Sequence, residues 1–252
     1  MAMIASLRRR PARPPAGVMS LTEHLGELRR RLVVSSLAVS AGAVVAFIFY
    51  GTMLSFFIHP YCATVGAGHR CDLFITSPLD GISIRFKLAA YGGLMLALPV
   101  VAWQVWRFIT PGLHSKERRY AVPFVAASTL VFAFGALVAW LTFPHALRWL
   151  GGIGGPHLQA LYSPSSYLSL ILALMLVFGI TFEIPVVLVA LEVAGVVKPE
   201  WLAARRRWAI VVITAFGAIA TPSSDPFSML ALAVPLTIFY FISIGIGKLL
   251  GR

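Results

Sequence analysis

Charged residues are scarce in this 252-residue sequence: Asp, Glu, Lys and Arg make up 12% of it, and apolar residues 59%. A soluble domain of ordinary composition has about a quarter of its residues charged. The shortage of charge therefore excludes an ordinary soluble domain and indicates an integral membrane protein. Acids are the scarcest charged residues, since 9 Asp and Glu stand against 21 Lys and Arg. Such an excess of cations can indicate a nucleic-acid partner, and the positions of the cations decide whether it does.

The sequence also lacks the motifs of most enzyme and metal sites. Its six histidines are scattered, with none at a paired metal-ligand spacing and none in a His-Glu-x-x-His motif. It contains no nucleophile beside a base and no nucleotide-binding motif. We therefore expect no enzyme activity, no metal and no cofactor.

Long apolar runs are the main feature of the sequence. Each of the first four is long enough, at about 1.5 Å per residue, to cross a hydrocarbon core about 30 Å thick. The fifth rises only about 20 Å, so it requires a locally thin bilayer or an extension into the neighbouring Thr and Pro. We predict an all-α bundle of six transmembrane helices, the last two short, at residues 32–50, 88–109, 120–143, 167–191, 208–220 and 227–246.

The chain before the first run is basic and rich in proline. Residues 1–18 contain four arginines and three prolines but no apolar stretch of the length of a secretory signal. We expect a disordered cytoplasmic tail there. The spacing Ser20-x-x-Glu23 then predicts a helix cap, followed by a short amphipathic helix on the membrane surface that leads into the first span. Residues 19–252 should form one transmembrane domain.

The orientation of the bundle follows from the positive-inside rule. Six spans place all but four of the Lys and Arg residues on one side of the membrane, the exceptions being Arg70, Arg85, Lys87 and Arg148. That side should be cytoplasmic and should hold both termini. The excess of cations is explained in this way without nucleic acid.

The connection between the first two spans falls on the outer side and contains both cysteines, Cys62 and Cys71. We favour a disulfide between them on this oxidising side, worth about 2.5 to 3 kcal/mol on the chain-entropy model, with two free thiols as the alternative. Later in the same connection, the sequence from Ser77 to Asp80 predicts a helix start, with Ser77 as the cap, Pro78 at the first position and an acid in the first turn.

Glu183 is the charge that stands out within the apolar runs, and Pro185 follows it closely. A carboxylate at bilayer depth costs about 2.5 to 3.5 kcal/mol on the insertion scale, so it should be protonated, paired or facing a wet cavity. Pro185 frees the carbonyl of Thr181 and kinks the helix at the same level. We predict a functional intramembrane site, and a buried Glu that only bonds a neighbouring helix is the alternative.

Two further acids lie near the predicted cytoplasmic ends of spans. Glu27 is three and four residues before Arg30 and Arg31, which is the spacing of helical ion pairs. Glu117 comes just before the third span, where an acid favours the helix dipole. Their positions alone indicate only these structural roles.

Several motifs, taken together and in this order, resemble the TatC subunit of the twin-arginine protein translocase. None of them is specific alone. The motifs are His24-Leu25-Gly26-Glu27-Leu28-Arg29-Arg30-Arg31-Leu32, Pro99, Gln104-Val105-Trp106-Arg107-Phe108, Pro111-Gly112-Leu113, Glu117-Arg118-Arg119, Phe178-Gly179, Phe182-Glu183-Ile184-Pro185-Val186, Thr221-Pro222 and Asp225.

The resemblance implies a receptor, in the cytoplasmic membrane of a bacterium, for folded precursors whose signal peptides contain consecutive arginines. It implies that Glu27 and Glu117 bind the arginine pair, in a surface that includes Arg29, Phe108 and Leu113. A second site, at Glu183, Pro185 and Asp225, would contact partner helices or the apolar part of the signal. The implied partners are small single-span subunits of the same translocase, membrane lipid and further copies of the chain.

This sequence differs from the family pattern in its last span, where Phe241 occupies the position at which the family often has an acid. A function of another class is the alternative to the receptor function. A proton-coupled secondary transporter would also keep an intramembrane acid such as Glu183 beside a proline-broken helix, although it would usually contain paired repeats.

Overall fold

The structure is a computed structural model and describes residues 21–62, 64, 73–109, 121–153, 155, 162–222 and 225–249. The regular elements in these ranges are all helices, which confirms the all-α prediction. The predicted tail and Ser20 lie outside them. The helices are α1 (Leu21–Ile48), α2 (Tyr50–Cys62), α3 (Asp80–Ile109), α4 (Ala121–Ile153), α5 (Pro164–Val193), α6 (Pro199–Ala204), α7 (Arg206–Ala220) and α8 (Pro226–Leu249).

Five of the described helices are long and apolar enough to cross a membrane, namely α1, α3, α4, α5 and α8. α7 has 15 residues and a length of about 22 Å, so it is short, like the apolar run that predicted it. α8 has 24 residues, or about 36 Å, and is shorter than the other four yet long enough to cross. A sixth crossing by α7 remains a prediction.

Several helices extend beyond their apolar runs. α1 is continuous from Leu21, so the predicted surface helix and the first span are one element. Between Glu23 and Leu32 only Gly26 disfavours a helix, by about 1 kcal/mol, and packing on α3 offsets that cost. α3 begins at Asp80 rather than at residue 88, and α4 continues to Ile153 rather than to residue 143.

The segment between α1 and α3 contains one element that was predicted and one that was not. α3 starts with a reciprocal cap, because Leu79 N–H donates to Ser77 Oγ at 3.4 Å and Ser77 N–H donates to Asp80 Oδ2 at 3.0 Å. This confirms Ser77 as a capping residue, although α3 itself begins at Asp80, two residues after the predicted first position at Pro78. α2 was not expected, and it is tied to α5 by the hydroxyl of Tyr167, which donates to the carbonyl oxygen of Phe57 at 2.8 Å.

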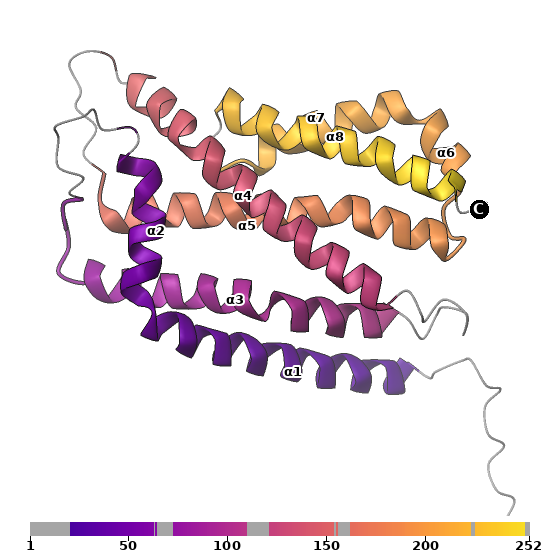
Figure 1. Cartoon of the computed structure of the whole chain (residues 1–252), viewed down its shortest axis with the longest axis horizontal. Coiled ribbons are helices and arrows are strands. Elements are labelled where there is room, and N and C mark those ends of the chain that lie inside the picture. Colours follow the sequence, from indigo (N-terminus) through magenta and orange to yellow (C-terminus); the bar gives the residue numbers. More distant parts are fainter. Residues whose placement is uncertain are drawn as a thin grey trace, which may run out of the picture.

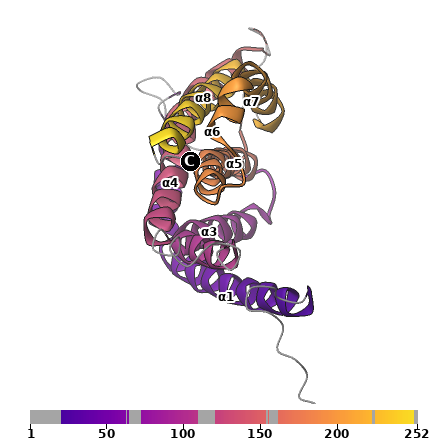
Figure 2. The same cartoon turned by 90° about the vertical axis from the view of Figure 1, so that its right-hand side faces the viewer.

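The long helices form a curved row. α1 and α3 lie side by side at one edge, α7 and α8 lie at the other, and α4 and α5 lie between them (Figure 1, Figure 2). We call the end where α1 begins and α3 ends the Arg29 end, and the end where α3 and α5 begin the Asp80 end. α2 runs across the Asp80 end (Figure 1). The first and last described residues, Leu21 and Leu249, both lie at the Arg29 end.

α1 and α3 approach each other closely. A Cβ placed on Gly93 would lie 2.5 Å from the backbone nitrogen of Ala43 and 2.7 Å from the carbonyl oxygen of Val39. The backbones therefore touch without a side chain between them, as small residues allow in membrane helix pairs. This packing fixes the position of the start of α1 against the end of α3.

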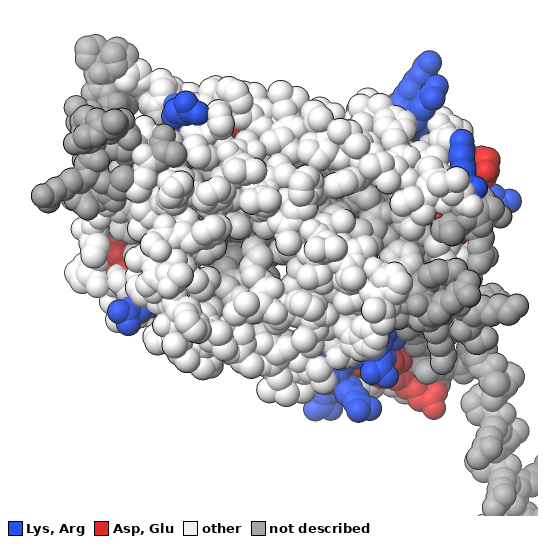
Figure 3. Space-filling view, in the orientation of Figure 1, with Lys and Arg blue, Asp and Glu red and all other residues white. Residues whose placement is uncertain are grey.

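The outer surface is apolar along the middle of the bundle. Leu37 on α1 and Leu130 on α4 are 65% and 70% exposed. On the face shown in Figure 3, the charged side chains gather towards the two ends, and the band between them carries almost none. An uncharged belt between charged ends is the surface that a lipid bilayer requires.

Candidate functional site

The start of α1 and the end of α3 form a corner at the Arg29 end. His24 on α1 stacks on Phe108 on α3, with ring centroids 4.4 Å apart and planes inclined at 23°. Glu27 follows His24 by about one helical turn. The structure therefore brings two of the predicted signal-peptide residues, Glu27 and Phe108, to the same corner, although one comes from each helix.

Glu27 is oriented by Arg31 on the same helix. Arg31 Nε donates to Glu27 Oε1 at 3.1 Å, and Arg31 Nη2 contacts the same oxygen. Arg31 Nη1 also donates to Gln104 Oε1 on α3 at 3.4 Å. The predicted helical ion pair is thus present, but Glu27 Oε2 accepts no hydrogen bond from the described residues. A carboxylate can accept about four hydrogen bonds, so this group retains capacity for a ligand.

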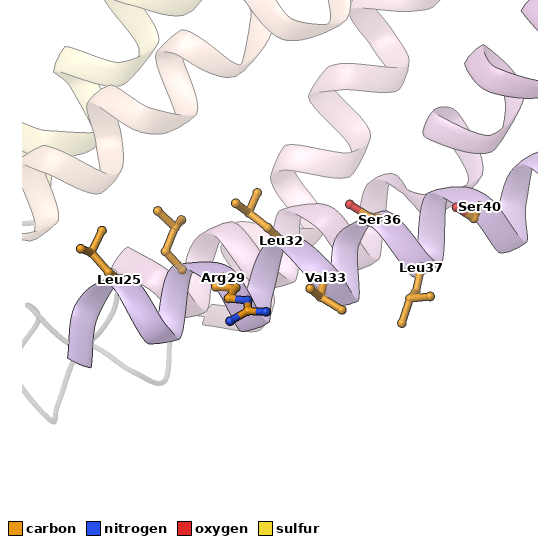
Figure 4. A pocket seen from close by; sticks show the side chains of 8 residues that line it. Leu25, Arg29, Leu32, Val33, Ser36, Leu37 and Ser40 are labelled. Carbon is orange, nitrogen blue, oxygen red and sulfur yellow. The ribbon is translucent and has the colours of Figure 1, made fainter. Parts of the chain in front are cut away.

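Arg29 lies on a different face of α1. Two residues along a helix correspond to a rotation of about 200°, which takes Arg29 away from the side of Glu27. It lines a shallow hollow of about 420 Å³ with Leu25, Leu32 and Ser36 (Figure 4). The structure does not bring Arg29 to the corner of Glu27 and Phe108.

The other two predicted signal-peptide residues, Leu113 and Glu117, lie outside the described residues. They belong to residues 110–120, which join the end of α3 to the start of α4. Their meeting with Glu27 remains a prediction.

Glu183 faces both a neighbouring helix and a cavity. Ser128 on α4 donates to Glu183 Oε2 at 2.6 Å, whereas Glu183 Oε1 is buried and has no hydrogen-bond partner. Beside it lies a cavity of about 280 Å³ whose walls come from α3, α4 and α5. The walls are apolar except for Glu183, Ser128 and the indole of Trp106. A helix carrying a hydrogen-bond donor would satisfy Oε1 there.

The two residues grouped with Glu183 lie in different surroundings. Pro185 is buried within α5, one helical turn after Thr181. Asp225 is 1% exposed, and its Oδ1 accepts from Ser228 N–H at 2.7 Å at the start of α8. That start lies towards the Asp80 end, where α5 also begins (Figure 1). Glu183 lies in the second half of α5 (Pro164–Val193), away from that end. The structure therefore does not bring Asp225 to Glu183.

Glu192 is a buried acid that the sequence analysis missed. It is fully buried near the end of α5, and both carboxyl oxygens have no hydrogen-bond partner. Gly247 on α8 makes room for it, since a Cβ on Gly247 would lie 2.5 Å from Glu192 Oε2. The fourth span was predicted to end at Leu191, one residue before Glu192. An acid directly after a long apolar run was the available signal.

The described residues contain no group of three or more His, Cys, Asp or Glu side chains that could hold a metal ion. Cys62 is the last residue of α2. Cys71 lies outside the described residues, so the disulfide remains a prediction.

Comparison with known proteins identifies the family. Residues 23–235 match the model of the Sec-independent protein translocase protein TatC. The TatC of Frankia casuarinae is 39% identical over 243 residues, which cover 93% of this chain and 67% of that protein. The TatC of Aquifex aeolicus is 39% identical over 237 residues, which cover 93% of this chain and 97% of that protein.

The fold agrees with this relationship. A crystal structure of the twin-arginine translocase receptor TatC superposes with a TM-score of 0.73 and 38% sequence identity, covering 91% of this chain and 100% of that one. These comparisons do not support the secondary-transporter alternative. The chain belongs to the TatC family and is a subunit of the twin-arginine translocase.

Proposed function

We propose that this chain is the receptor of its translocase and binds the consecutive arginines of a precursor's signal peptide at the cytoplasmic face of a bacterial inner membrane. The observation that carries the proposal is the corner at the Arg29 end. There Glu27 is oriented by Arg31, retains an oxygen with no described donor and lies about one turn from the ring stacked on Phe108.

The chemistry of that corner suits a guanidinium group. A planar guanidinium forms two parallel hydrogen bonds with a carboxylate and also stacks on aromatic rings. Glu27 supplies one carboxylate and Phe108 an aromatic ring. Glu117 is four residues before Ala121, so its Cα lies within about 14 Å of the start of α4. That tether allows Glu117 to supply the second carboxylate, and Leu113 an apolar contact, in the same surface.

The cavity beside Glu183 is the proposed site for an apolar helix. Its walls are almost entirely apolar, and the buried Oε1 of Glu183 lacks a donor. A single-span partner subunit, or the apolar part of the signal, would fill the cavity and donate to that oxygen. Pro185 supports the site by interrupting the hydrogen bonds of α5 beside it. Asp225 is a separate contact candidate at the start of α8, and further copies of the chain are proposed to join the complex.

The proposed topology has six crossings, with α7 as the short one and both termini in the cytoplasm. The common position of Leu21 and Leu249 at the Arg29 end supports an even number of crossings (Figure 1). The cations that the positive-inside rule counts as cytoplasmic include Arg205, which lies between α6 and α7, and Arg206 and Arg207, the first two residues of α7. One domain, residues 19–252, would contain all crossings.

Site-specific photocrosslinking tests the receptor proposal. A photoreactive residue at Phe108 should crosslink a signal peptide that contains Arg-Arg, and an unlabelled Arg-Arg peptide should compete. The matched control is Phe56, an exposed aromatic residue on α2 at the Asp80 end. Crosslinking of the peptide at position 56 as strong as at position 108 would contradict the proposal.

A further inference from the structure

Lys87 holds a charge that no described acid balances. It lies on α3 near the Asp80 end, and its Nζ donates to Ser165 Oγ at 2.8 Å, to Ser169 Oγ at 2.7 Å and more weakly to the carbonyl oxygen of Ser165 at 3.4 Å. All three acceptors are neutral groups on α5. Among the described residues Lys87 forms no ion pair, so its positive charge lacks a counterion.

The surrounding hydroxyl groups present hydrogen-bond donors. The hydroxyl of Ser169 donates to the carbonyl oxygen of Ser165 at 2.7 Å, and Ser163 Oγ donates to Ser166 Oγ at 3.0 Å. Ser165 Oγ is already occupied as an acceptor by Lys87. The hydroxyl hydrogens of Ser165 and Ser166 find no acceptor in the described structure, so both can donate to a ligand.

A shallow hollow of about 430 Å³ lies beside these groups. Lys87, Ser165, Ser166 and Ser169 form its polar part, and its apolar part is made by Leu170, Ala173 and Pro222. The described lining residues supply one ammonium charge and two available hydroxyl donors, and they include no acid. This combination favours an anion. The adjoining apolar wall favours an anion that carries a hydrocarbon chain.

The depth of Lys87 matches a lipid headgroup. α3 has 30 residues and a length of about 45 Å, which exceeds a hydrocarbon core of about 30 Å by about 15 Å. Lys87 lies seven residues, or about 10 Å, from the start of this helix at Asp80. Half of the excess is about 7 Å, so the backbone of Lys87 lies only about 3 Å inside the edge of the core when the helix is centred. Its side chain reaches Ser165, the second residue of α5, which brings the ammonium group close to the headgroup level.

We propose that the hollow at Lys87, Ser165 and Ser166 binds the phosphodiester of a phospholipid, with the acyl chains along Leu170 and Ala173. The bound lipid would supply the missing counterion. Because the phosphate would contact Lys87 of α3 and two serines of α5, it would tie these two helices together at the Asp80 end. The site is distinct from the corner of Glu27 and Phe108, which lies at the opposite end of the bundle.

Lipid titration of the purified full-length protein in detergent tests the proposal, with native mass spectrometry as the readout. Phosphatidylglycerol should bind saturably, and diacylglycerol with the same chains should bind at least about tenfold more weakly, because it lacks the phosphate. Lys87→Gln should weaken phosphatidylglycerol binding by about the same factor. Arg148→Gln removes an exposed cation predicted on the same side and should leave the affinity unchanged.

Two further variants keep the test independent of folding. Ser166→Ala preserves every hydrogen bond of Lys87 and should still lower the lipid affinity, whereas Lys87→Arg keeps the charge and should retain most of it. Equal affinity for the two lipids, or equal phosphatidylglycerol affinity in the parent, Lys87→Gln and Ser166→Ala, would overturn the proposal. Displacement of the lipid by an equal concentration of inorganic phosphate would overturn the assignment to a phospholipid, since the chains would then contribute nothing.

Discussion

Glu183 has one carboxyl oxygen that is hydrogen-bonded and one that is not, so its variants can separate hydrogen bonding from charge. Glu183→Gln keeps an oxygen that accepts from Ser128 and should retain much of the export activity. Glu183→Ala should lose more, because it removes the acceptor and leaves the Ser128 hydroxyl unsatisfied at a depth where such groups are costly. Export of a folded precursor in cells, corrected for the amount of each variant, is the measurement.

Ser128→Ala is the matched variant for this prediction, because it removes the donor but keeps the carboxyl group. If hydrogen bonding is what the site uses, its export activity should fall between that of the parent and that of Glu183→Ala. Complete and equal loss in Glu183→Gln and Glu183→Ala would show instead that the charge or its proton is needed.

Gly247 should be intolerant of a side chain because of Glu192. Alanine is normally better than glycine in a helix by up to about 1 kcal/mol. At position 247, however, the added Cβ would lie 2.5 Å from Glu192 Oε2 and 2.8 Å from Pro199 Cγ. Gly247→Ala should therefore destabilise the protein by about 1 to 3 kcal/mol, the usual cost of overpacking, and lower its melting temperature in detergent.

Gly245 supplies the control, because nothing lies within 4 Å of a Cβ built there. Gly245→Ala should leave the melting temperature unchanged or raise it slightly. The double variant Gly247→Ala/Glu192→Ala should recover part of the loss, since the shortened side chain makes room. A double variant that melts no higher than Gly247→Ala would show that Glu192 is not what the new methyl group meets.

Single residues could be predicted from the sequence where the signal lies in neighbouring positions of the chain. Glu183 was found because it interrupts an apolar run, and the Ser77 cap because its partners follow within three residues. Arg29 and Glu192 show the limit. The face on which Arg29 lies depends on how α1 packs against α3, and the burial of Glu192 depends on Gly247, which is 55 positions away in the chain. Neither relation is visible without the tertiary structure.

Apolar runs predicted the long helices, because a transmembrane helix needs about 20 apolar residues and other kinds of segment rarely contain so long an apolar run. The ends were less predictable, since polar residues continue a helix beyond the bilayer at little cost. α2 was missed because its 13 residues are too few to span and it was read as part of a connection. Its position depends on packing against α5 through Tyr167 and Phe57.

The contact between α1 and α3 should depend on Gly93. A Cβ there would meet backbone atoms of Ala43 and Val39, which cannot move aside as a side chain can. Gly93→Ala should therefore force the two helices apart and lower the melting temperature. It should also weaken the binding of an Arg-Arg signal peptide, since Glu27 and Phe108 lie on these two helices. The control is Gly81→Ala on the same helix, where nothing lies within 4 Å of the added Cβ. Equal melting temperatures and affinities for the two variants would contradict the prediction.

Cys62 and Cys71 should be linked in the segment between α1 and α3. Both fall on the predicted oxidising side, where disulfides persist. We expect a membrane-impermeant thiol reagent to label intact cells only after reduction, and Cys62→Ser to make the remaining thiol reactive without it. Ready labelling of the unreduced parent protein at both cysteines would show that the thiols are free.

The whole molecule keeps its two ends chemically distinct. At the Arg29 end an oriented carboxylate lies beside stacked aromatic rings, and at the Asp80 end Lys87 lies beside serine hydroxyls. Between the ends, the face shown in Figure 3 carries almost no charge, and the cavity beside Glu183 is lined mostly by apolar side chains. This division suits the proposed binding of a cationic peptide segment at one membrane surface and of an apolar helix within the bilayer. The resemblance implied that Glu27 and Phe108 share one surface, whereas the contacts of Lys87 with serines of α5 required the fold.

Signal recognition is proposed to need two carboxylates, Glu27 at the start of α1 and Glu117 before α4. If each takes one guanidinium, Glu27→Ala and Glu117→Ala should each remove a charge-assisted contact worth about 1.5 to 3 kcal/mol, or about tenfold to a hundredfold in affinity. Lysine at either position should be worse, because it adds repulsion. A signal peptide with Lys-Lys in place of Arg-Arg should bind the parent protein weakly, since Lys lacks the planar fork, and its affinity should change little on either substitution.

Glu200→Ala is the control, because it removes an exposed acid near the start of α6. Binding of both peptides to each folded variant, in detergent at fixed salt, is the measurement. If Glu27→Ala and Glu117→Ala bind the Arg-Arg signal as tightly as the parent and Glu200→Ala do, the two acids are only helix-end and ion-pair residues, and another surface must read the arginines.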